Sequence, residues 1–334
     1  MNKEILLREY RNLCSDIRKI YVVPLINYSF KKTGYLYLLY KDFIENKEKY
    51  NFKIQSLSVF SLPLIALSRL KKEKCILHYH WLEINDLQSL GGLIWKIFWV
   101  SLYKLLNGRI IWTIHNQFPH NNKYIFLNRT VRKYIAHIAD KLQVHCKSAV
   151  NIMMPVLNVN ESKFFIIDHP IFPVEIIEKD KSSALLNQKY FPNKIKSEDI
   201  LFLMFGEIAE YKGIKKVVEI FNSLEEKKKL LIAGIVKKGH MKNYKEILSS
   251  IKNQNQILIC NKRIPDEDAM LFLNSCDYAL FNFKEVLTSG SVFLALSYKK
   301  NIIVPSKGCL KELKGDNIIH FENEEELNNI LNKC

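Results

Sequence analysis

The chain has 334 residues, 48% of them apolar and 25% charged, which is ordinary for a globular protein and long enough for two domains. Every stretch of 18 residues contains a charge, and the first residues mix charged with apolar side chains, so we expect neither a membrane-spanning helix nor an export signal. The seven cysteines form no Cys-x-x-Cys pair. This argues against a disulfide framework or a cysteine zinc site and favours a reducing cytoplasm.

The net charge of +16 is concentrated in the first half of the chain. Residues 1–172 contain 25 Lys and Arg against 12 Asp and Glu, and the remaining residues contain 25 against 22. A basic half predicts an anionic partner, such as a lipid surface, a nucleic acid or a phosphorylated substrate. A lysine-rich codon usage explains the same numbers, and we find no nucleic-acid-binding motif.

Apolar strand patterns alternate with helix patterns through the first half, which is typical of a parallel sheet covered by helices on both faces. We expect helices at 3–18, 35–44, 90–106 and 128–139, and strands at 21–26, 52–57, 76–81, 109–114, 141–145 and 164–167.

Residues 173–198 interrupt the alternation with two prolines and many charges, so we interpret them as a linker. The alternation then resumes, with strands expected at 200–205, 230–234, 257–260, 277–283 and 302–304, and helices at 214–224, 243–252, 266–275 and 292–298. We therefore expect an α/β protein with two Rossmann-like domains, 1–172 and 199–334, facing across a cleft. The last helix can pack back on the N-terminal domain.

Two strand-to-helix turns in the second domain are candidates for binding phosphate. The first, Gly206–Gly213, has a glycine at each end and Lys212 next to the second. The second contains Thr288, Ser289, Gly290 and Ser291. Small residues before a helix leave backbone N–H groups accessible at the positive end of the helix dipole, which suits a phosphate. A capped buried helix and an ordinary surface loop are the alternatives.

Seven of the nine histidines lie between residues 78 and 169. His115 ends a strand and His120 follows in the next loop, so both are candidates for hydrogen bonding or proton transfer, with structural histidines as the alternative. Glu83 is a nearby carboxylate that could act as a base. His78 and His80 share one strand face and could hold a metal, but we expect no metal site.

The segment 93–106 combines aromatic side chains with interposed lysines. Such a helix can lie in a bilayer interface and be attracted by anionic lipid. A helix packed between a sheet and solvent has a similar pattern, and both interpretations stay open.

The second half resembles glycosyltransferase family 4 and its relatives, which have the GT-B fold. The resemblance rests on residues 205–213, 263–268, 287–291 and 295–298. A weaker resemblance to bacterial surface-polysaccharide transferases of this group rests on His78–Glu83 and Trp112–His120.

This resemblance implies a metal-independent hexosyltransferase without a cofactor, whose donor is a nucleotide-diphosphate sugar, with UDP or GDP expected. Gly206 and Lys212 would contact the diphosphate, and Arg263 and Ile264 would lie near the base. The phosphate and sugar end would be bound at Thr288, Ser289, Gly290 and Ser291. The acceptor would be a lipid-linked saccharide of surface polysaccharide synthesis, reached by a cytoplasmic protein bound peripherally to the inner face of the cell membrane through its basic N-terminal domain.

The chain departs from the family pattern at two places. Glu207, Ala209 and Glu210 stand where the family usually has an arginine near the first glycine. The family's two glutamates, eight residues apart, fall at Leu287 and Ala295. A non-catalytic subunit that binds a nucleotide or a partner protein is therefore an alternative, and a metal-dependent hydrolase is a weaker one.

Overall fold

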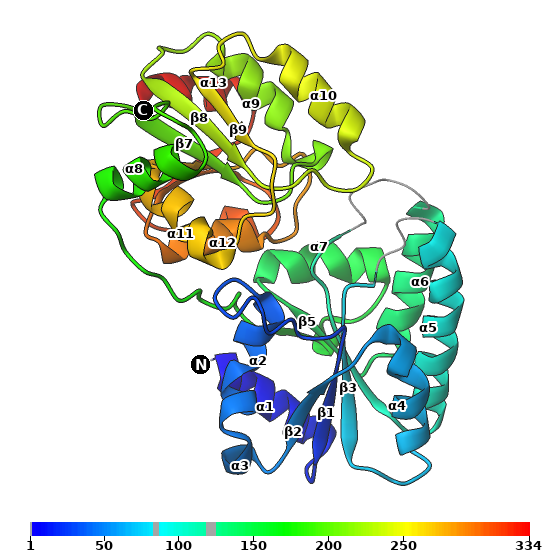
Figure 1. The fold of residues 1–334 in the computed structure, drawn as a ribbon. Coiled ribbons are helices and arrows are strands. Elements are labelled where there is room, and N and C mark those ends of the chain that lie inside the picture. The colour runs from blue at the N-terminus through cyan, green and yellow to red at the C-terminus, as the bar shows by residue number, and fades with distance from the viewer. Residues whose placement is uncertain (1, 83–86, 118–124) are drawn as a thin grey trace. The chain divides into compact units, whose positions relative to one another are not determined.

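The computed structural model describes residues 2–82, 87–117 and 125–334. The chain divides into two compact units, Met1–Pro170 and Ile171–Cys334. Each unit contains one parallel sheet of six strands with helices on both faces (Figure 1). The expected α/β fold class is confirmed.

The sheet of the N-terminal unit has the strand order β2-β1-β3-β4-β5-β6. Its strands are β1 (Lys19–Val23), β2 (Lys53–Ser56), β3 (Cys75–His80), β4 (Arg109–Thr113), β5 (Lys141–Val144) and β6 (Phe164–Ile166). Its helices are α1 (Asn2–Leu13), α2 (Tyr35–Glu45), α3 (Lys47–Tyr50), η1 (Val59–Ser61), α4 (Leu62–Ser68), α5 (Leu87–Leu105), α6 (Ile125–Ile138), α7 (Lys147–Leu157) and η2 (Glu161–Lys163).

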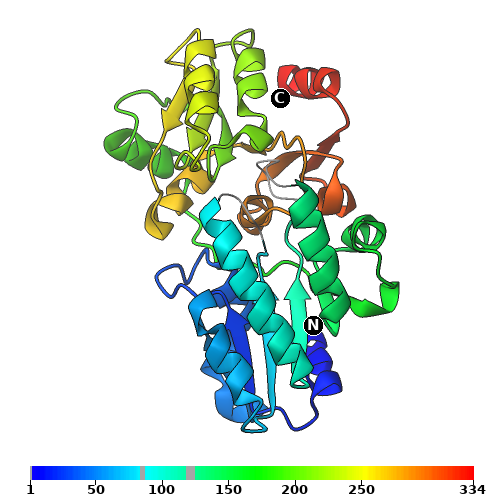
Figure 2. The same ribbon diagram turned by 90° about the vertical axis from the view of Figure 1, so that its right-hand side faces the viewer.

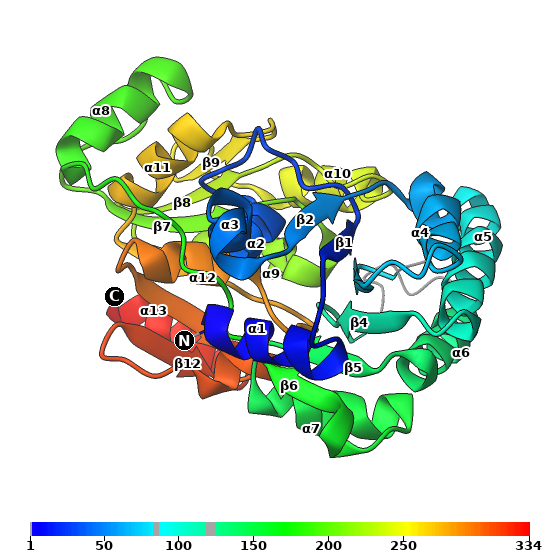
Figure 3. The same ribbon diagram turned by 90° about the horizontal axis from the view of Figure 1, so that it is seen from below.

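The direction of the strand order decides which face each helix covers. The connection from β1 to β2 runs one way along the sheet and all later connections run the other way, so right-handed crossovers place their helices on opposite faces. Figure 3 shows α1 and α2 on one side of this sheet and α4, α5 and α6 on the other. The core under α1 and α2 contains Tyr10, Tyr40 and Phe43, which are fully buried.

The sheet of the C-terminal unit has the order β12-β11-β10-β7-β8-β9. Its strands are β7 (Ile200–Phe205), β8 (Lys228–Ala233), β9 (Ile257–Cys260), β10 (Tyr278–Leu280), β11 (Asn301–Pro305) and β12 (Ile318–Phe321). Its helices are α8 (Lys179–Lys189), η3 (Glu210–Lys212), α9 (Ile214–Phe221), α10 (Met241–Ser250), α11 (Asp266–Ser275), α12 (Gly290–Ser297), η4 (Gly308–Glu312) and α13 (Glu324–Lys333).

One core cluster of this unit joins α9, α10 and α13 to the sheet. The helix α13 buries Leu327 and Leu331 in that cluster. Its packing on the N-terminal domain stays a prediction. The segment 173–198, interpreted as a linker, contains α8, and the aromatic rings of Tyr190 and Phe272 link the end of α8 to α11. The boundary between the units falls before that segment, at Pro170.

Candidate functional site

The strand order of the C-terminal unit reverses between β7 and β10, which are neighbours in the sheet. From β7 the chain continues to β8 on one side, and from β10 it continues to β11 on the other. Ligands of doubly wound sheets bind at the carboxyl ends of the strands that flank such a reversal. Both predicted phosphate turns begin there, because the Gly206–Gly213 loop follows β7 and the Thr288–Ser291 turn follows β10.

Three of the predicted residues come together at this point. Gly206 has φ +102°, a value that favours glycine. A Cβ atom at Gly206 would lie 2.8 Å from Nζ of Lys212 and 3.1 Å from Oγ of Ser291. An ammonium group, a hydroxyl group and a bare backbone segment therefore converge from the two turns.

Burial sets the electrostatics of Lys212. Its side chain is 7% exposed, and Nζ donates to the carbonyl oxygen of Phe205 at 3.1 Å. Desolvation lowers the pKa of Lys212 from 10.5 to about 8, and the nearby Glu207 carboxylate opposes that change. A carbonyl group leaves the ammonium charge uncompensated, so the arrangement suits an incoming anion.

Contacts with neighbouring segments hold the Gly206–Gly213 loop in shape. A Cβ at Gly213 would lie 2.4 Å from the carbonyl oxygen of Asn282, whose side chain donates to Gly213 O at 3.1 Å. The backbone N–H of Lys284 donates to Tyr211 O at 2.8 Å. On the other side, a Cβ at Gly234 would lie 2.2 Å from the carbonyl oxygen of Gly206. The loop is thus packed between the ends of β8 and β10.

The second turn is supported from η4. A Cβ at Gly308 would lie 2.2 Å from the carbonyl oxygen of Val286, just before the turn. Ser289 is the N-cap of α12, and Gly290 and Ser291 are its first two residues, whose N–H groups have no acceptor within the helix. Within the part of the chain that the structure describes, Oγ1 of Thr288 is buried and lacks a hydrogen-bond partner. These N–H and hydroxyl groups belong to the turn that was predicted from the sequence to bind a phosphate.

The other two predicted donor-binding residues lie in the loop between β9 and α11. Arg263 is exposed and Ile264 is half-buried. Their strand is two positions from β7 in the sheet order, a separation of about 10 Å. The structure therefore places them at the same carboxyl edge as Gly206 but apart from the group formed with Lys212 and Ser291.

In the N-terminal unit, His78 and His80 lie on one face of β3, as the strand pattern predicts. Their rings stack at a centroid distance of 4.6 Å. Oη of Tyr40, from α2, is 2.7 Å from Nδ1 of His78 and 2.8 Å from Nε2 of His80. Nδ1 of His78 also contacts Oη of Tyr10, and its Nε2 is 2.8 Å from Oγ1 of Thr113. These bonds use both nitrogens of His78 within a buried network.

The network continues to His115, just beyond the end of β4. Nδ1 of His80 lies 3.2 Å from Nε2 of His115. The indole of Trp81 stacks on the His115 ring with a centroid distance of 4.3 Å and an interplanar angle of 12°. Trp81 has φ +43°, a left-handed value that is unusual for a bulky residue. Residues held in such strained conformations cluster at functional sites. His115 is 9% exposed, whereas His78 and His80 are fully buried.

Burial keeps these histidines neutral. Desolvation lowers the pKa of His78 to about 3 and holds the pKa values of His80 and His115 well below 6.5. His145 and His169, which lie near Tyr35 in the same cluster, have pKa values lowered to about 4 and about 3. The expectation that His115 has a pKa suited to proton transfer is therefore wrong, and its imidazole can donate and accept hydrogen bonds as a neutral group.

Two predicted catalytic residues, His120 and Glu83, lie outside the described residues. No sequence pattern marks Tyr35 or Tyr40 for the site, because the packing of α2 on the sheet brings their rings to the histidines. Trp81 lies in the His78–Glu83 segment of the resemblance, but its positive φ and its stacking on His115 are visible only in the structure. Within residues 2–82, 87–117 and 125–334, no group of three or more His, Cys, Asp or Glu is arranged to hold a metal ion.

Comparisons with known proteins agree with this architecture. Residues 187–333 match the family described as Glycosyl transferases group 1. The structure of HepE from Anabaena in complex with UDP and glucose superposes with a TM-score of 0.68 at 11% identity, covering 95% of this chain and 89% of HepE. A glycosyltransferase from Rickettsia africae gives a TM-score of 0.64 at 15% identity, covering 96% and 88%.

Sucrose-phosphate synthase from Thermosynechococcus elongatus gives a TM-score of 0.69 at 10% identity, covering 95% of this chain and 89% of the synthase. The comparison with curated protein sequences gave no match. Two six-stranded parallel sheets in one chain, matched over nearly its whole length, define the fold. The protein therefore has the GT-B fold, and residues 187–333 belong to the group 1 glycosyltransferases, the group of glycosyltransferase family 4.

Proposed function

We propose that the protein transfers a sugar from a nucleotide-diphosphate sugar to a saccharide acceptor. The observation that carries the proposal is the convergence of Gly206, Lys212 and Ser291 at the strand-order reversal of the C-terminal unit. Membership of residues 187–333 in the group 1 glycosyltransferases supports it. The UDP and glucose bound by HepE, a protein of the same fold, favour a UDP-sugar as the first donor to test.

Different residues would bind different parts of the donor. The Lys212 ammonium group and the first N–H groups of α12 would bind the diphosphate and stabilise its negative charge as it leaves. Thr288 would donate its buried hydroxyl to the same group. Arg263 and Ile264, about 10 Å away along the sheet edge, are suitably placed for the base of a nucleotide.

The N-terminal unit would supply the acceptor side. His115, held by His80 and covered by Trp81, would position the reacting groups through hydrogen bonds as a neutral imidazole. His120 and Glu83 remain proposed catalytic residues on the strength of the sequence. A transfer that inverts the anomeric centre needs a base such as Glu83, whereas a transfer that retains it can use the leaving phosphate.

We further propose that the acceptor is a lipid-linked saccharide of bacterial surface polysaccharide synthesis, met at the inner face of the cell membrane by a cytoplasmic, peripherally bound protein. The excess of 25 Lys and Arg over 12 Asp and Glu in residues 1–172 supports an anionic surface as the partner. The resemblance of the His78–Glu83 and Trp112–His120 segments to polysaccharide transferases supports the acceptor class.

A thermal-shift series with UDP, GDP and ADP tests the donor site, because a ligand that binds the native state raises the melting temperature. We expect one nucleotide to raise it and the corresponding nucleotide sugar to be turned over. Binding without hydrolysis or transfer, with any acceptor, would instead favour the non-catalytic subunit suggested by Leu287 and Ala295. No shift with any nucleotide would refute the donor site.

A further inference from the structure

The outer surface of the N-terminal unit exposes an unusual number of large apolar side chains. Phe60 in η1 is 83% exposed, Ile94 and Leu105 in α5 are 70% and 79% exposed, and Phe126 in α6 is 83% exposed. We call this surface of η1, α4, α5 and α6 the apolar face. It also includes Leu64, Leu67, Leu70, Trp95 and Phe98. Isolated apolar residues are common on protein surfaces, but a contiguous set marks an interaction site.

The helices that form the apolar face lie side by side, as Figure 2 shows from that side. Nε1 of Trp95 donates to the carbonyl oxygen of Val59 at 3.2 Å, which joins α5 to η1. Oγ of Ser101 and Oη of Tyr134 are hydrogen bonded at 2.6 Å, which joins α5 to α6. The exposed side chains therefore belong to one continuous layer.

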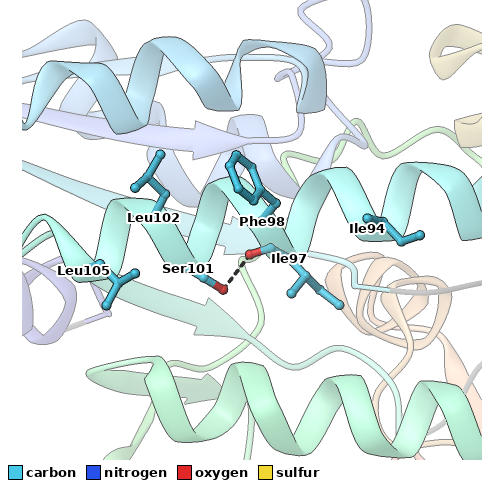
Figure 4. A pocket seen from close by; sticks show the side chains of 6 residues that line it. All are labelled: Ile94, Ile97, Phe98, Ser101, Leu102 and Leu105. Carbon is cyan, nitrogen blue, oxygen red and sulfur yellow. Dashed lines mark hydrogen bonds between the residues drawn. The ribbon is translucent and has the colours of Figure 1, made fainter.

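A shallow apolar groove of about 440 Å³ runs along α5 within this face. Its lining follows one stripe of the helix, as the side chains in Figure 4 show: Ile94, Ile97, Phe98, Ser101, Leu102 and Leu105. The hydroxyl of Ser101 also bonds to the carbonyl oxygen of Ile97, within the helix. The groove thus presents methyl and methylene groups outward.

Basic residues predominate around the apolar face, where the carboxylate of Asp140 pairs with Lys104 and Arg109. The segments Val59–Lys72, Leu87–Gln117 and Ile125–Ala139 contain no Asp or Glu in their sequences. Besides the buried Arg132, the same segments contain eight basic residues: Arg69, Lys71, Lys72, Lys96, Lys104, Arg109, Arg129 and Lys133. A predominantly basic and apolar layer is complementary to a bilayer with anionic headgroups, into which apolar side chains insert while Lys and Arg remain at the headgroups.

We propose that the apolar face is a membrane-docking surface that lies on an anionic bilayer. A second copy of the chain fits it less well, because a self-complementary contact would bring two basic layers together. None of the helices that the structure describes is long and apolar enough to cross a bilayer, which fits a layer lying at the interface. The inference deepens the proposed function and rests on it for the purpose of docking, namely to meet a lipid-linked acceptor.

Vesicle binding of the full chain tests the inference without donor or acceptor. The probes are vesicles of phosphatidylcholine alone and of phosphatidylcholine mixed with phosphatidylglycerol. We expect the wild-type protein to sediment with the mixed vesicles, and more strongly at low salt. The triple variant Leu64→Gln/Phe98→Gln/Leu105→Gln should bind at least about tenfold more weakly, because three apolar side chains no longer insert.

A matched triple variant serves as the control. Ile176, Ile235 and Leu248 are exposed apolar residues of the C-terminal unit, and their replacement by Gln should leave vesicle binding unchanged. Trp95, which is 39% exposed on the apolar face, should be quenched by brominated lipid, and Trp95→Phe should remove most of that signal.

Three outcomes would overturn the inference: wild-type protein that ignores the mixed vesicles, an apolar-face variant that binds them as tightly as wild type, or a self-association that this variant abolishes. A nucleotide thermal shift, recorded on the same samples, reports the donor site separately. Vesicle binding without a nucleotide shift would refute the proposed donor site and retain the docking surface. A nucleotide shift without vesicle binding would retain the donor site and refute the docking surface.

Discussion

At the scale of single residues, Lys212 is the side chain on which the donor site depends. Its ammonium group is buried beside a glycine backbone and paired with a carbonyl oxygen, so part of its hydration has been lost before any ligand arrives. An anion that enters recovers this cost, because opposite charges interact strongly where water is excluded.

Replacement of Lys212 by Ala should weaken UDP binding by about 1.5–3 kcal/mol, the scale of a hydrogen bond to a charged group. Isothermal titration calorimetry measures the change. Lys227→Ala is the matched control, because Lys227 is an exposed lysine just before β8, at the opposite end of that strand from the turns. Equal UDP affinity for wild type and Lys212→Ala would remove Lys212 from the site.

The lowered pKa of Lys212 also predicts a pH dependence. Below about pH 8 the ammonium form is present and UDP binds it directly. Above that pH the free protein loses the proton and must take it up again on binding, so the affinity should fall by up to about tenfold per pH unit. Titrations in buffers of different ionisation enthalpy would detect the uptake. Lys212→Arg, whose guanidinium stays charged, should lack this slope.

At the scale of structural elements, the loop between β7 and α9 depends on the conformation of Gly206. Gly206 and Gly239 both have positive φ, at +102° and +88°. A Cβ atom at Gly206 would meet Lys212 and Ser291, whereas at Gly239 nothing lies within 4 Å. A comparison of substitutions at the two glycines therefore distinguishes the effect of backbone strain, which both share, from the effect on the donor site, which only Gly206 contacts.

Gly206→Ala and Gly239→Ala should each destabilise the fold by about 1 kcal/mol through the positive φ. Only Gly206→Ala should also lose UDP binding, since its methyl group displaces the Lys212 ammonium and the Ser291 hydroxyl. Urea unfolding and calorimetry on the two variants provide the comparison. A Gly206→Ala protein with normal UDP affinity would show that the turn does not approach the ligand.

Apolar runs with flanking turn residues predicted several elements closely. The strand at 200–205 and the helix at 266–275 have the predicted bounds. Other helices escaped notice for physical reasons. The helix α7 contains Pro155 in its interior, where proline argues against a helix, whereas Pro63 lies in the first turn of α4, where proline is tolerated. The helix α8 lies in a segment so rich in charge that it suggested a linker, and its packing against α11 comes from tertiary structure.

The site was predictable to the extent that it depends on local chemistry. Glycine, serine and lysine at strand-to-helix turns indicated Gly206, Lys212 and Ser291, because parallel strands bring such turns to one edge. The hydroxyl partners of His78 and His80 were not predictable, since Tyr40 is brought to them by the packing of α2 on the sheet. The conformation of Trp81 and the depressed pKa of His115 likewise depend on burial, which a residue pattern does not report.

At the scale of the whole molecule, the two units should respond to different conditions. The histidine cluster lies in the N-terminal unit, and Lys212 lies in the C-terminal unit. Protonation of the histidines should therefore lower the stability of the N-terminal unit, whereas nucleotide binding should raise the stability of the C-terminal unit.

Stability of the N-terminal unit should fall as the pH drops below 6.5. The pKa values of His78, His145 and His169 are lowered from 6.5 to about 3, 4 and 3, so the unfolded chain takes up protons first. Each group then costs about 1.4 kcal/mol per pH unit, or about 4 kcal/mol for the three at pH 5.5. Urea unfolding at pH 7 and pH 5.5 measures this loss. Unchanged stability would contradict the buried, neutral state.

The close approach of Gly234 to Gly206 has a consequence for engineering new specificities. A side chain at Gly234 would collide with the carbonyl oxygen of Gly206, so the geometry of the first turn is set partly by a strand that no substrate needs to touch. Grafting the β7 loop of another transferase into this chain will transplant its selectivity only if the end of β8 is carried with it. The smallest segment pair that can be exchanged in the C-terminal unit is therefore the loop after β7 together with the end of β8.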